Sequence, residues 1–320
     1  MRKSTKTWLI IAAALILLGG ILFVSVMTTL KWDFKKLSTA RFETTNHEIS
    51  EEISSISIDA DTADIRFLPA EGETCSVVCY EQENLKHTVA VKDGTLTLKV
   101  VDTRKWYEHI GFQFESPKIT VYLPAGDYAT LSVKSDTGDI EVAAELHFES
   151  IDISLSTGDV TTYASATGVI KIATSTGDIH MKDVNAGALA LSTSTGDVIV
   201  SGATCVGDAT VGVTTGKVYL THVVCENVTT SGDTGNILLK DVIATQKLSI
   251  ERSTGKVKLE SVDAAEILIK TDTGDVTGSL LSEKVFIVNT DTGKIEVPDT
   301  VTGGRCEITT DTGDIKITIN

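Results

Sequence analysis

Acidic side chains recur at two fixed positions beside ten Thr-Gly pairs in the later part of this sequence. The residue after the glycine is Asp in six copies, and the residue two before it is Asp in five. Carboxylates repeated in register could bind Ca²⁺, as they do in β-rolls. Three copies carry Asp at both positions, and the two around Gly274 and Gly313 supply the candidate calcium ligands: Asp272, Asp275, Asp311 and Asp314.

The same residues also suit a structural role, because Asp and Ser side chains accept backbone N–H bonds at turns. The repeat lacks the second glycine and the nine-residue period of calcium-binding β-rolls. The position after the glycine is also interrupted by Lys217, Asn236, Lys256 and Lys294. We therefore favour turn residues over metal ligands, and we expect no cofactor.

Five cysteines are the next candidates for chemistry. Cys205 and Cys225 hold the same place one copy apart, so their Cα atoms should lie about 5 Å apart, within disulfide range. Other copies place Ala there, which favours a small buried side chain and leaves the bridge open. Cys75 and Cys79 would share one strand face about 13 Å apart, too far to bridge. We find no Cys/His spacing typical of zinc sites.

Enzyme motifs are lacking. The six histidines occupy unrelated positions, and neither a nucleophile elbow nor a phosphate loop occurs. Glycoside cleavage needs two carboxylates at a set separation, and this sequence offers dozens without singling out a pair. We therefore expect no enzyme, with a carbohydrate-active β-helix enzyme as the less favoured alternative.

The elements that must position these residues are set by the period of the repeat. The Thr-Gly pairs recur every 19 or 20 residues, which indicates a solenoid. Their turn glycines are Gly138, Gly158, Gly177, Gly196, Gly216, Gly235, Gly255, Gly274, Gly293 and Gly313.

Strands are expected on both sides of each glycine. A β-branched apolar residue stands two positions after every one, and apolar residues alternate at seven and five positions before it. This period of two predicts two short strands per copy, each with one buried face, followed by a looser return. Small residues nine positions after the glycine suggest a second tight corner. In the four-residue turn around each Thr-Gly pair, glycine stands at the third position, as in a type II turn. This position favours a corner at which the coil turns onto a new face, rather than a tight hairpin. A β-meander is the alternative architecture.

The N-terminus carries an apolar segment, Trp8 to Leu30, of 23 uncharged residues. As a helix it would be roughly 35 Å long, enough to cross a bilayer. A cleaved signal peptide is the alternative, but the apolar run is long for one and no Ala-x-Ala-like site follows. We expect a retained anchor, with the short basic tail inside the cell and the long domain outside.

The rest of the chain is acidic. Residues 1–41 contain seven Lys and Arg against one acid, and the remainder has a net charge of −22. Such a domain should bind neither nucleic acid nor an anionic lipid surface. We divide the chain into a basic tail (1–7), an anchor (8–30), a linker (31–49), an irregular β cap with the first coils (50–130) and the repeat solenoid (131–320). The aromatic stretch with Trp106, Tyr107, Phe112 and Phe114 should cover the first coil.

The anchor, the strand Ile-Thr-Val-Tyr-Leu-Pro at 119–124 and the serial Thr-Gly corners resemble the bacterial putative-adhesin family. The resemblance covers residues 50 to 320 and implies a cell-envelope protein built from β-strand repeats, of unknown function. It implies no catalytic residues.

We therefore predict an all-β protein: a parallel β-helix or β-solenoid of about ten coils behind one N-terminal transmembrane helix. It would act at the bacterial membrane as a non-catalytic binding, adhesion or structural module. Its partners would be an envelope protein or a glycan, or a second copy through the uncapped C-terminal rung around Ile315. The alternative is an envelope-stress sensor or accessory protein acting through a membrane partner.

Overall fold

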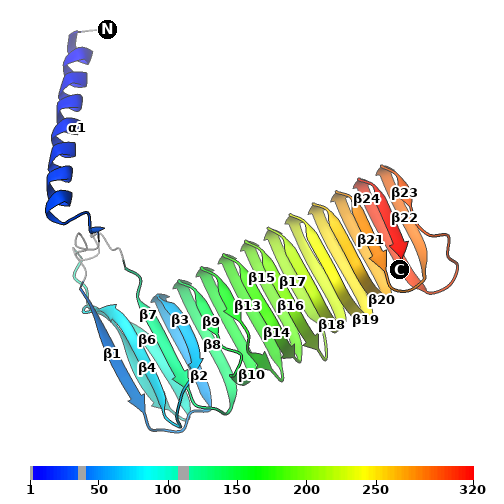
Figure 1. Ribbon diagram of the computed structural model, residues 1–320, viewed down its shortest axis with the longest axis horizontal. Helices are drawn as coiled ribbons and strands as arrows, with labels where there is room; N and C mark the ends of the chain where they lie inside the picture. The colour runs from blue at the N-terminus through cyan, green and yellow to red at the C-terminus, as the bar shows by residue number, and fades with distance from the viewer. Residues whose placement is uncertain (1–2, 35–40, 107–114) are drawn as a thin grey trace.

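The computed structural model describes residues 3–34, 41–106 and 115–320. It shows one helix and a long β-solenoid (Figure 1). Tyr107, Phe112 and Phe114, which we expected in the cap, lie outside the described residues, and Trp106 is exposed.

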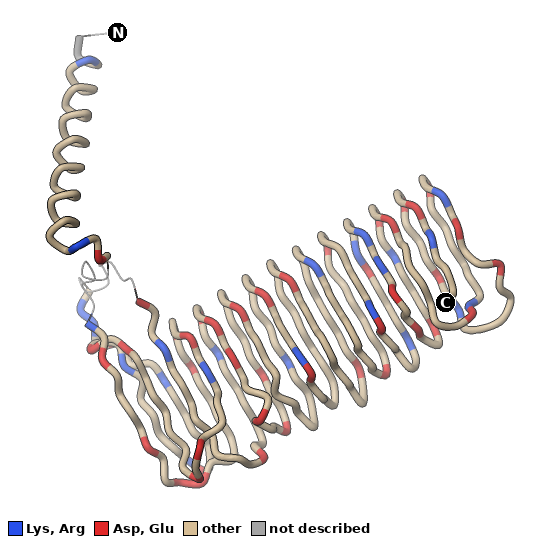
Figure 2. The backbone as a smooth tube through the Cα atoms, in the orientation of Figure 1, with Lys and Arg blue, Asp and Glu red and all other residues tan. Residues whose placement is uncertain are grey.

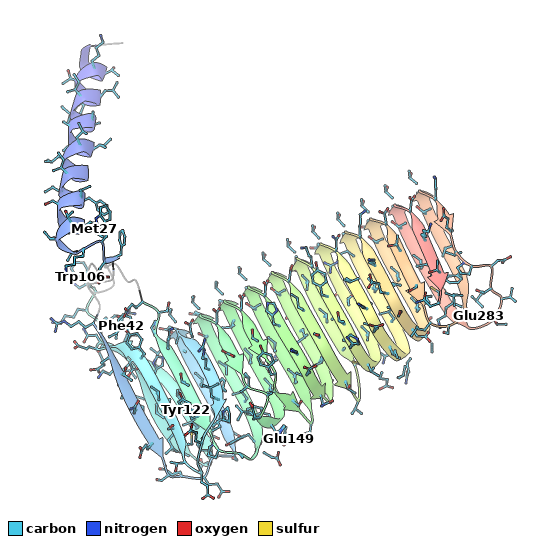
Figure 3. All side chains as sticks on the ribbon, in the orientation of Figure 1. Met27, Phe42, Trp106, Tyr122, Glu149 and Glu283 are labelled. Carbon is cyan, nitrogen blue, oxygen red and sulfur yellow. The ribbon has the colours of Figure 1, made fainter. Side chains whose placement is uncertain are left out.

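Helix α1 (Lys3–Thr29) contains the apolar segment. Within Thr5–Thr29, an 18-residue segment has a mean hydropathy of 2.9 and is 0% buried, so the helix is long and apolar enough to cross a membrane. Its side chains project on all sides without a neighbouring element along most of its length (Figure 3). The helix therefore has the exposed apolar surface of a membrane span or a signal sequence.

The described residues contain twenty-five strands, which form one continuous sheet wound into coils. The first nine are β1 (Phe42–Ile49), β2 (Ser55–Thr62), β3 (Asp64–Pro69), β4 (Cys75–Gln82), β5 (Leu85–Lys92), β6 (Thr95–Asp102), β7 (Lys118–Leu123), β8 (Asp127–Thr137) and β9 (Ile140–Val142). The next nine are β10 (His147–Thr157), β11 (Val160–Thr162), β12 (Ser165–Ala166), β13 (Val169–Thr176), β14 (Ile179–Ala186), β15 (Ala188–Thr195), β16 (Val198–Cys205), β17 (Ala209–Thr215) and β18 (Val218–Thr234). The last seven are β19 (Ile237–Thr254), β20 (Val257–Thr273), β21 (Val276–Leu280), β22 (Lys284–Thr292), β23 (Ile295–Glu296), β24 (Gly304–Thr312) and β25 (Ile315–Ile319).

Adjacent coils pair in parallel at equivalent repeat positions. Ile151, for example, lies opposite Leu131 on one side and Ile170 on the other. Parallel pairing of each repeat copy with its spatial neighbours confirms the solenoid and excludes the β-meander, whose neighbours would be antiparallel.

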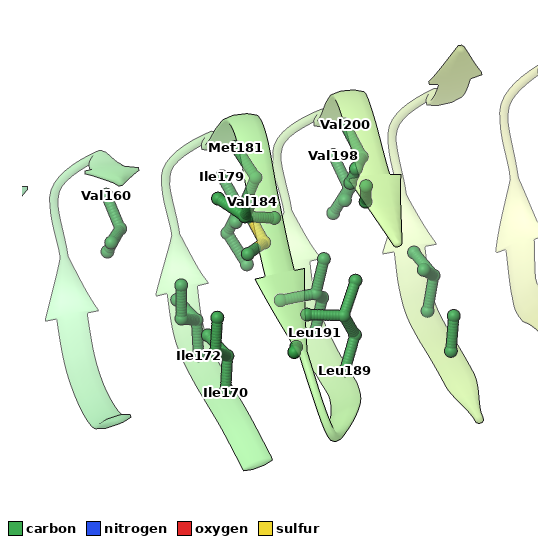
Figure 4. Packing of buried hydrophobic residues seen from close by; sticks show 14 of the residues in the cluster. Val160, Ile170, Ile172, Ile179, Met181, Val184, Leu189, Leu191, Val198 and Val200 are labelled. Atoms are coloured by element: carbon green, nitrogen blue, oxygen red, sulfur yellow. The ribbon is translucent and has the colours of Figure 1, made fainter. Parts of the chain in front are cut away.

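The core is a column of aliphatic side chains inside the coils. In the coil around Gly177, Ile170 and Ile172 precede the corner and Ile179 and Met181 follow it, all at most 2% exposed. Figure 4 shows these side chains converging with those of the next coil. Burying each such side chain contributes roughly 1.5–3 kcal/mol to the free energy of folding. Because neighbouring coils bury these side chains together, the stability of each coil depends on contact with the next.

The return segment is more regular than the sequence suggested. It adds a third pair of buried positions, seven and nine residues after the glycine, such as Val184 and Ala186. The second corner lies six residues after the glycine, not nine, and its residue has positive φ in five successive coils: Asp183, Gly202, His222, Asp241 and Ser261. The small residue at nine instead packs inside, opposite its equivalent in the next coil.

The coils are not stacked in chain order at the C-terminal end. Strands β24 and β25 lie between β20–β21 on one side and β22–β23 on the other (Figure 1). The prediction of a bare rung around Ile315 is therefore wrong, because Ile315 pairs on both sides and β22–β23 is the outermost rung. The reason lies in size: Phe286 of β22 occupies a core position that smaller side chains fill elsewhere, and it lies opposite Cys306. An outer rung has room for the ring.

The N-terminal end has a similar inversion and an antiparallel cap. Strands β2 and β3 lie between β6–β7 and β8–β9. Strand β4 runs antiparallel to β7 and to β1, while β5 runs antiparallel to β6. These antiparallel strands cover the first coil.

Candidate binding surface

Each Thr-Gly corner is held by close stacking of backbone on backbone. Nine of the ten glycines have φ between +129° and +156°, and Gly293 is the exception. At Gly216 an added Cβ would lie 1.9 Å from the carbonyl oxygen of Gly196 in the previous coil. Glycine is thus required twice over, by its φ and by the approach of the next chain.

The Asp after the glycine bonds the next coil. An Oδ1 of Asp159 accepts the backbone N–H of Asp178 at 2.7 Å, and Asp178 accepts that of Asp197 in the same way. Asn236 does the same for Lys256 at 2.9 Å. This ladder of side-chain acceptors satisfies one backbone donor per corner, which is the turn role argued from the sequence.

The four candidate calcium ligands take part in this stacking. Asp275 accepts the N–H of Asp314 at 3.1 Å, and Asp314 accepts that of Lys294 at 2.8 Å. The Nζ of Lys256 lies 2.9 Å from Asp275, and its hydrogen bond lowers the pKa of that carboxyl. Asp272 and Asp311 are exposed. Among the described residues, no three of these corner acids bring ligand oxygens within 4.8 Å of one another.

The five cysteines are all buried and free. Cys205 and Cys225 occupy one inward column together with Ala186, Ala244 and Ala264. A hydrogen bond between their thiols lowers the pKa of Cys205 and raises that of Cys225. In this state they act as small core side chains.

One outward-facing column offers a continuous surface on the rod. It lies three residues after each corner, and paired strands carry it from coil to coil. Its members, in spatial order, are Arg66, Glu141, Thr161, His180, Ile199, Tyr219, Leu238, Lys258, Thr277, Lys316 and Glu296.

The charge and polarity of the side chains change along this column. Near the cap, Arg66 and Glu141 form an ion pair of 3.2 Å and, with Asp139, Asp159 and Tyr163, line a hollow of about 330 Å³. The middle is weakly polar: Ile199, Tyr219 and Leu238 are half-buried, with the Nζ of Lys217 6.0 Å from the Tyr219 ring centroid. Figure 2 shows the accompanying change of charge along the corner edge, from mainly acidic to mixed. The column therefore carries one aromatic and aliphatic stripe between two polar parts.

Two segments of the chain, residues 53–218 and 204–320, match the family model described as Toastrack DUF4097. The chain belongs to the Toastrack DUF4097 family. No curated protein matches the chain. The family match confirms the resemblance drawn from the Thr-Gly corners and the 119–124 strand.

Solved structures resemble this Toastrack chain across most of its length. A protein from Parabacteroides distasonis described as a putative adhesin has 12% identity and a TM-score of 0.52, with 88% of this chain and 98% of that chain covered. Another from the same species, described as a putative lipid binding protein, has 18% identity and a TM-score of 0.48, with the same coverage. A putative adhesin from Parabacteroides merdae has 11% identity and a TM-score of 0.33, covering 88% and 97%. The first of these likenesses supports the fold.

Sequence reasoning found the corners of this Toastrack solenoid but missed the surface beside them. The outward column varies in residue type from coil to coil, so no repeated letter marks it. The sequence does indicate this column by position: the residue between the two buried positions after each glycine must face outward, because successive strand residues point to opposite faces.

Proposed function

We propose that this chain is a membrane-anchored, extracytoplasmic binding module that holds a glycan of the cell envelope on the outward column of its solenoid. The observation that carries the proposal is the stripe Ile199–Tyr219–Leu238, the aromatic part of an otherwise polar column. Sugar rings stack on aromatic faces, and flanking hydroxyl and imidazole groups such as Thr161 and His180 supply hydrogen bonds.

The regularity of the coils supports a non-catalytic role. Catalytic sites usually break the regularity of their scaffold, whereas the described corners repeat the same hydrogen bonds from coil to coil. The family and the putative adhesin with the shared fold agree with a binding role.

Anchoring through α1 places the rod at the membrane surface. The apolar segment of the helix is almost entirely exposed, and the domain that follows is too acidic to lie on anionic lipid.

Cosedimentation with purified peptidoglycan sacculi tests the proposal. The full chain in detergent micelles should pellet with sacculi, and Tyr219→Ser combined with Leu238→Ser should weaken binding at least tenfold, since burying a large apolar side chain contributes about 1.5–3 kcal/mol. The matched control is Val224→Ser with Ile243→Ser, a paired and similarly exposed apolar couple outside the column. Equal loss in both pairs, or no binding by the unmodified chain, contradicts the glycan proposal.

A second candidate is a sensor that acts through a membrane partner. Gly19 and Gly20 lie inside α1 with open space around them, and small residues allow close helix packing in membranes. Replacing both with Leu should abolish cross-linking to a membrane partner while sacculi binding stays unchanged. Failure of that substitution to alter any cross-linked species argues against the sensor.

Self-association remains part of the proposal at the outer rung. Among the described strands, β22 pairs with β24 alone, and it exposes Val285 and Ile287 at 38% and 50%. An unpaired apolar edge favours pairing with a second copy. Analytical ultracentrifugation should show a concentration-dependent dimer that Ile287→Lys abolishes; a chain that stays monomeric at high concentration contradicts it.

A further inference from the structure

The N-terminal cap brings together three metal-ligating side chains that are far from the repeat. Cys79 and Glu81 lie on β4, two residues apart and therefore on the same face. His87 lies on β5, which follows β4 after the turn at Glu83 and Asn84. Their ligand atoms all lie within 4.8 Å of one another.

Burial of these groups is nearly complete. Cys79 is 0% exposed, Glu81 1% and His87 6%. One carboxylate oxygen of Glu81 accepts both the backbone N–H of His87 at 2.7 Å and its Nδ1 at 2.9 Å. A carboxylate withdrawn from water in this way needs a compensating positive charge.

Two imidazole nitrogens in this cap lack partners. The Nε2 of His87 is buried without a hydrogen bond, and so is the Nε2 of His47. His47 lies on β1 opposite Val77, and Thr45 lies opposite Cys79, so His47 is diagonal to Cys79 on the same buried face. Buried polar atoms are normally satisfied, so the unpartnered Nε2 of His87, in the same cluster as the Cys79 thiol, indicates a missing ligand.

We propose that Cys79, Glu81 and His87 bind a Zn²⁺ ion within the N-terminal cap, and that His47 on the neighbouring strand β1 is the candidate for the fourth ligand. Thiolate, imidazole and carboxylate are the three ligand types that zinc takes in proteins. A divalent ion bound by one thiolate and one carboxylate forms a neutral group, so the metal supplies the positive charge that the buried Glu81 carboxylate needs.

Binding requires a proton to leave. The thiol of Cys79 loses its proton to solvent as the Zn–S bond forms, and the other ligands bind as carboxylate and neutral imidazole. Zinc affinity should therefore rise with pH.

The site would clamp the cap rather than catalyse. Its residues come from β4 and β5, with His47 on β1, and these antiparallel strands close the first coil. A structural zinc contributes its binding energy to folding, so the ion would stabilise the end of the solenoid next to α1.

Cobalt and zinc titration of the full chain in detergent micelles, after removal of metal with a chelator, tests the site. Co²⁺ should bind at one equivalent per chain with a thiolate-to-cobalt charge-transfer absorption, and Zn²⁺ should displace it. Cys79→Ser and His87→Gln should each weaken zinc binding at least about 100-fold, the upper range for losing even an indirect contact. The controls are Cys306→Ser, a buried thiol at the opposite end, and His222→Gln, an exposed imidazole.

Binding lost in the two site variants and kept in the controls supports the zinc site. No charge-transfer band in the unmodified chain, or a band that survives Cys79→Ser, overturns it. If a variant fails to fold by circular dichroism, X-ray absorption of the zinc-loaded unmodified chain decides: a sulfur at about 2.3 Å supports the site, and a shell of oxygen and nitrogen alone overturns it.

Discussion

Gly216 offers a sharp test of the stacked corners, because it lies in the middle of the rod. Its φ is +145°, and a Cβ there would lie 1.9 Å from the carbonyl oxygen of Gly196. Backbone strain of this kind costs about 1–3 kcal/mol. Forcing the coils apart costs a further 1–3 kcal/mol or so. Gly216→Ala should therefore lower the free energy of unfolding by about 2–6 kcal/mol.

The matched control lies four residues earlier in the same coil. Gly212 is in strand β17, and a Cβ there would meet the side chain of Ser192 at 3.9 Å, an ordinary contact. Gly212→Ala should leave stability unchanged or raise it by up to about 1 kcal/mol. Urea unfolding of the full chain, followed by far-UV circular dichroism, measures both. Equal stability of Gly216→Ala and Gly212→Ala would refute the stacking argument.

Three further predictions concern the ladder, the buried thiols and the order of the coils. Asp197→Ala should cost about 0.5–1.5 kcal/mol in urea unfolding, because it removes the acceptor for the Lys217 N–H at 2.7 Å, whereas Asp197→Asn should retain most of it; equal losses contradict an acceptor role. Burial raises the pKa of Cys306 from 9.0 to about 12, so this thiol stabilises the fold below pH 9 and progressively less between pH 9 and 12. Cys306→Ala should therefore reduce the loss of folding stability at pH 10.5 by about 2 kcal/mol. An unchanged dependence of stability on pH argues against burial of a neutral thiol. Cysteines at Thr277 and Lys316, which are paired neighbours, should form a disulfide on oxidation, while Thr277 and Glu296, separated by the intervening coil, should not; the reverse pattern means that the coils stack in chain order.

Much of the coil could be predicted from the sequence because the physical demands repeat. Every corner needs a glycine, and the position two residues later always faces the core, so selection of Ile or Val there is visible ten times. The second corner left no such mark. Its left-handed residue is Asp, Gly, His or Ser, and Asp and His tolerate positive φ well enough that no single residue type is required.

The order of the end coils could not be predicted from the repeat, because the same 19–20 residue spacing is found whether the coils stack in chain order or not. The change of order is marked in the sequence only by a complementary pair, the large Phe286 and the small Cys306.

The metal-ligating cluster in the cap could not be predicted for a different reason. Cys79, Glu81 and His87 follow no zinc-like spacing, because a turn brings β5 back to the end of β4. Only the three-dimensional arrangement shows that they share one buried space.

The central claim is that the solenoid stands outside the cell on a retained helix. Its most direct test is labelling of intact cells with a membrane-impermeant maleimide, which the five buried native cysteines should not react with. Val301→Cys, at a site 86% exposed in the loop before β24, should be labelled in intact cells on a full-length band, and Lys3→Cys only after permeabilisation. Labelling of Lys3→Cys but not Val301→Cys in intact cells, or a labelled band shortened by loss of α1, would contradict the account.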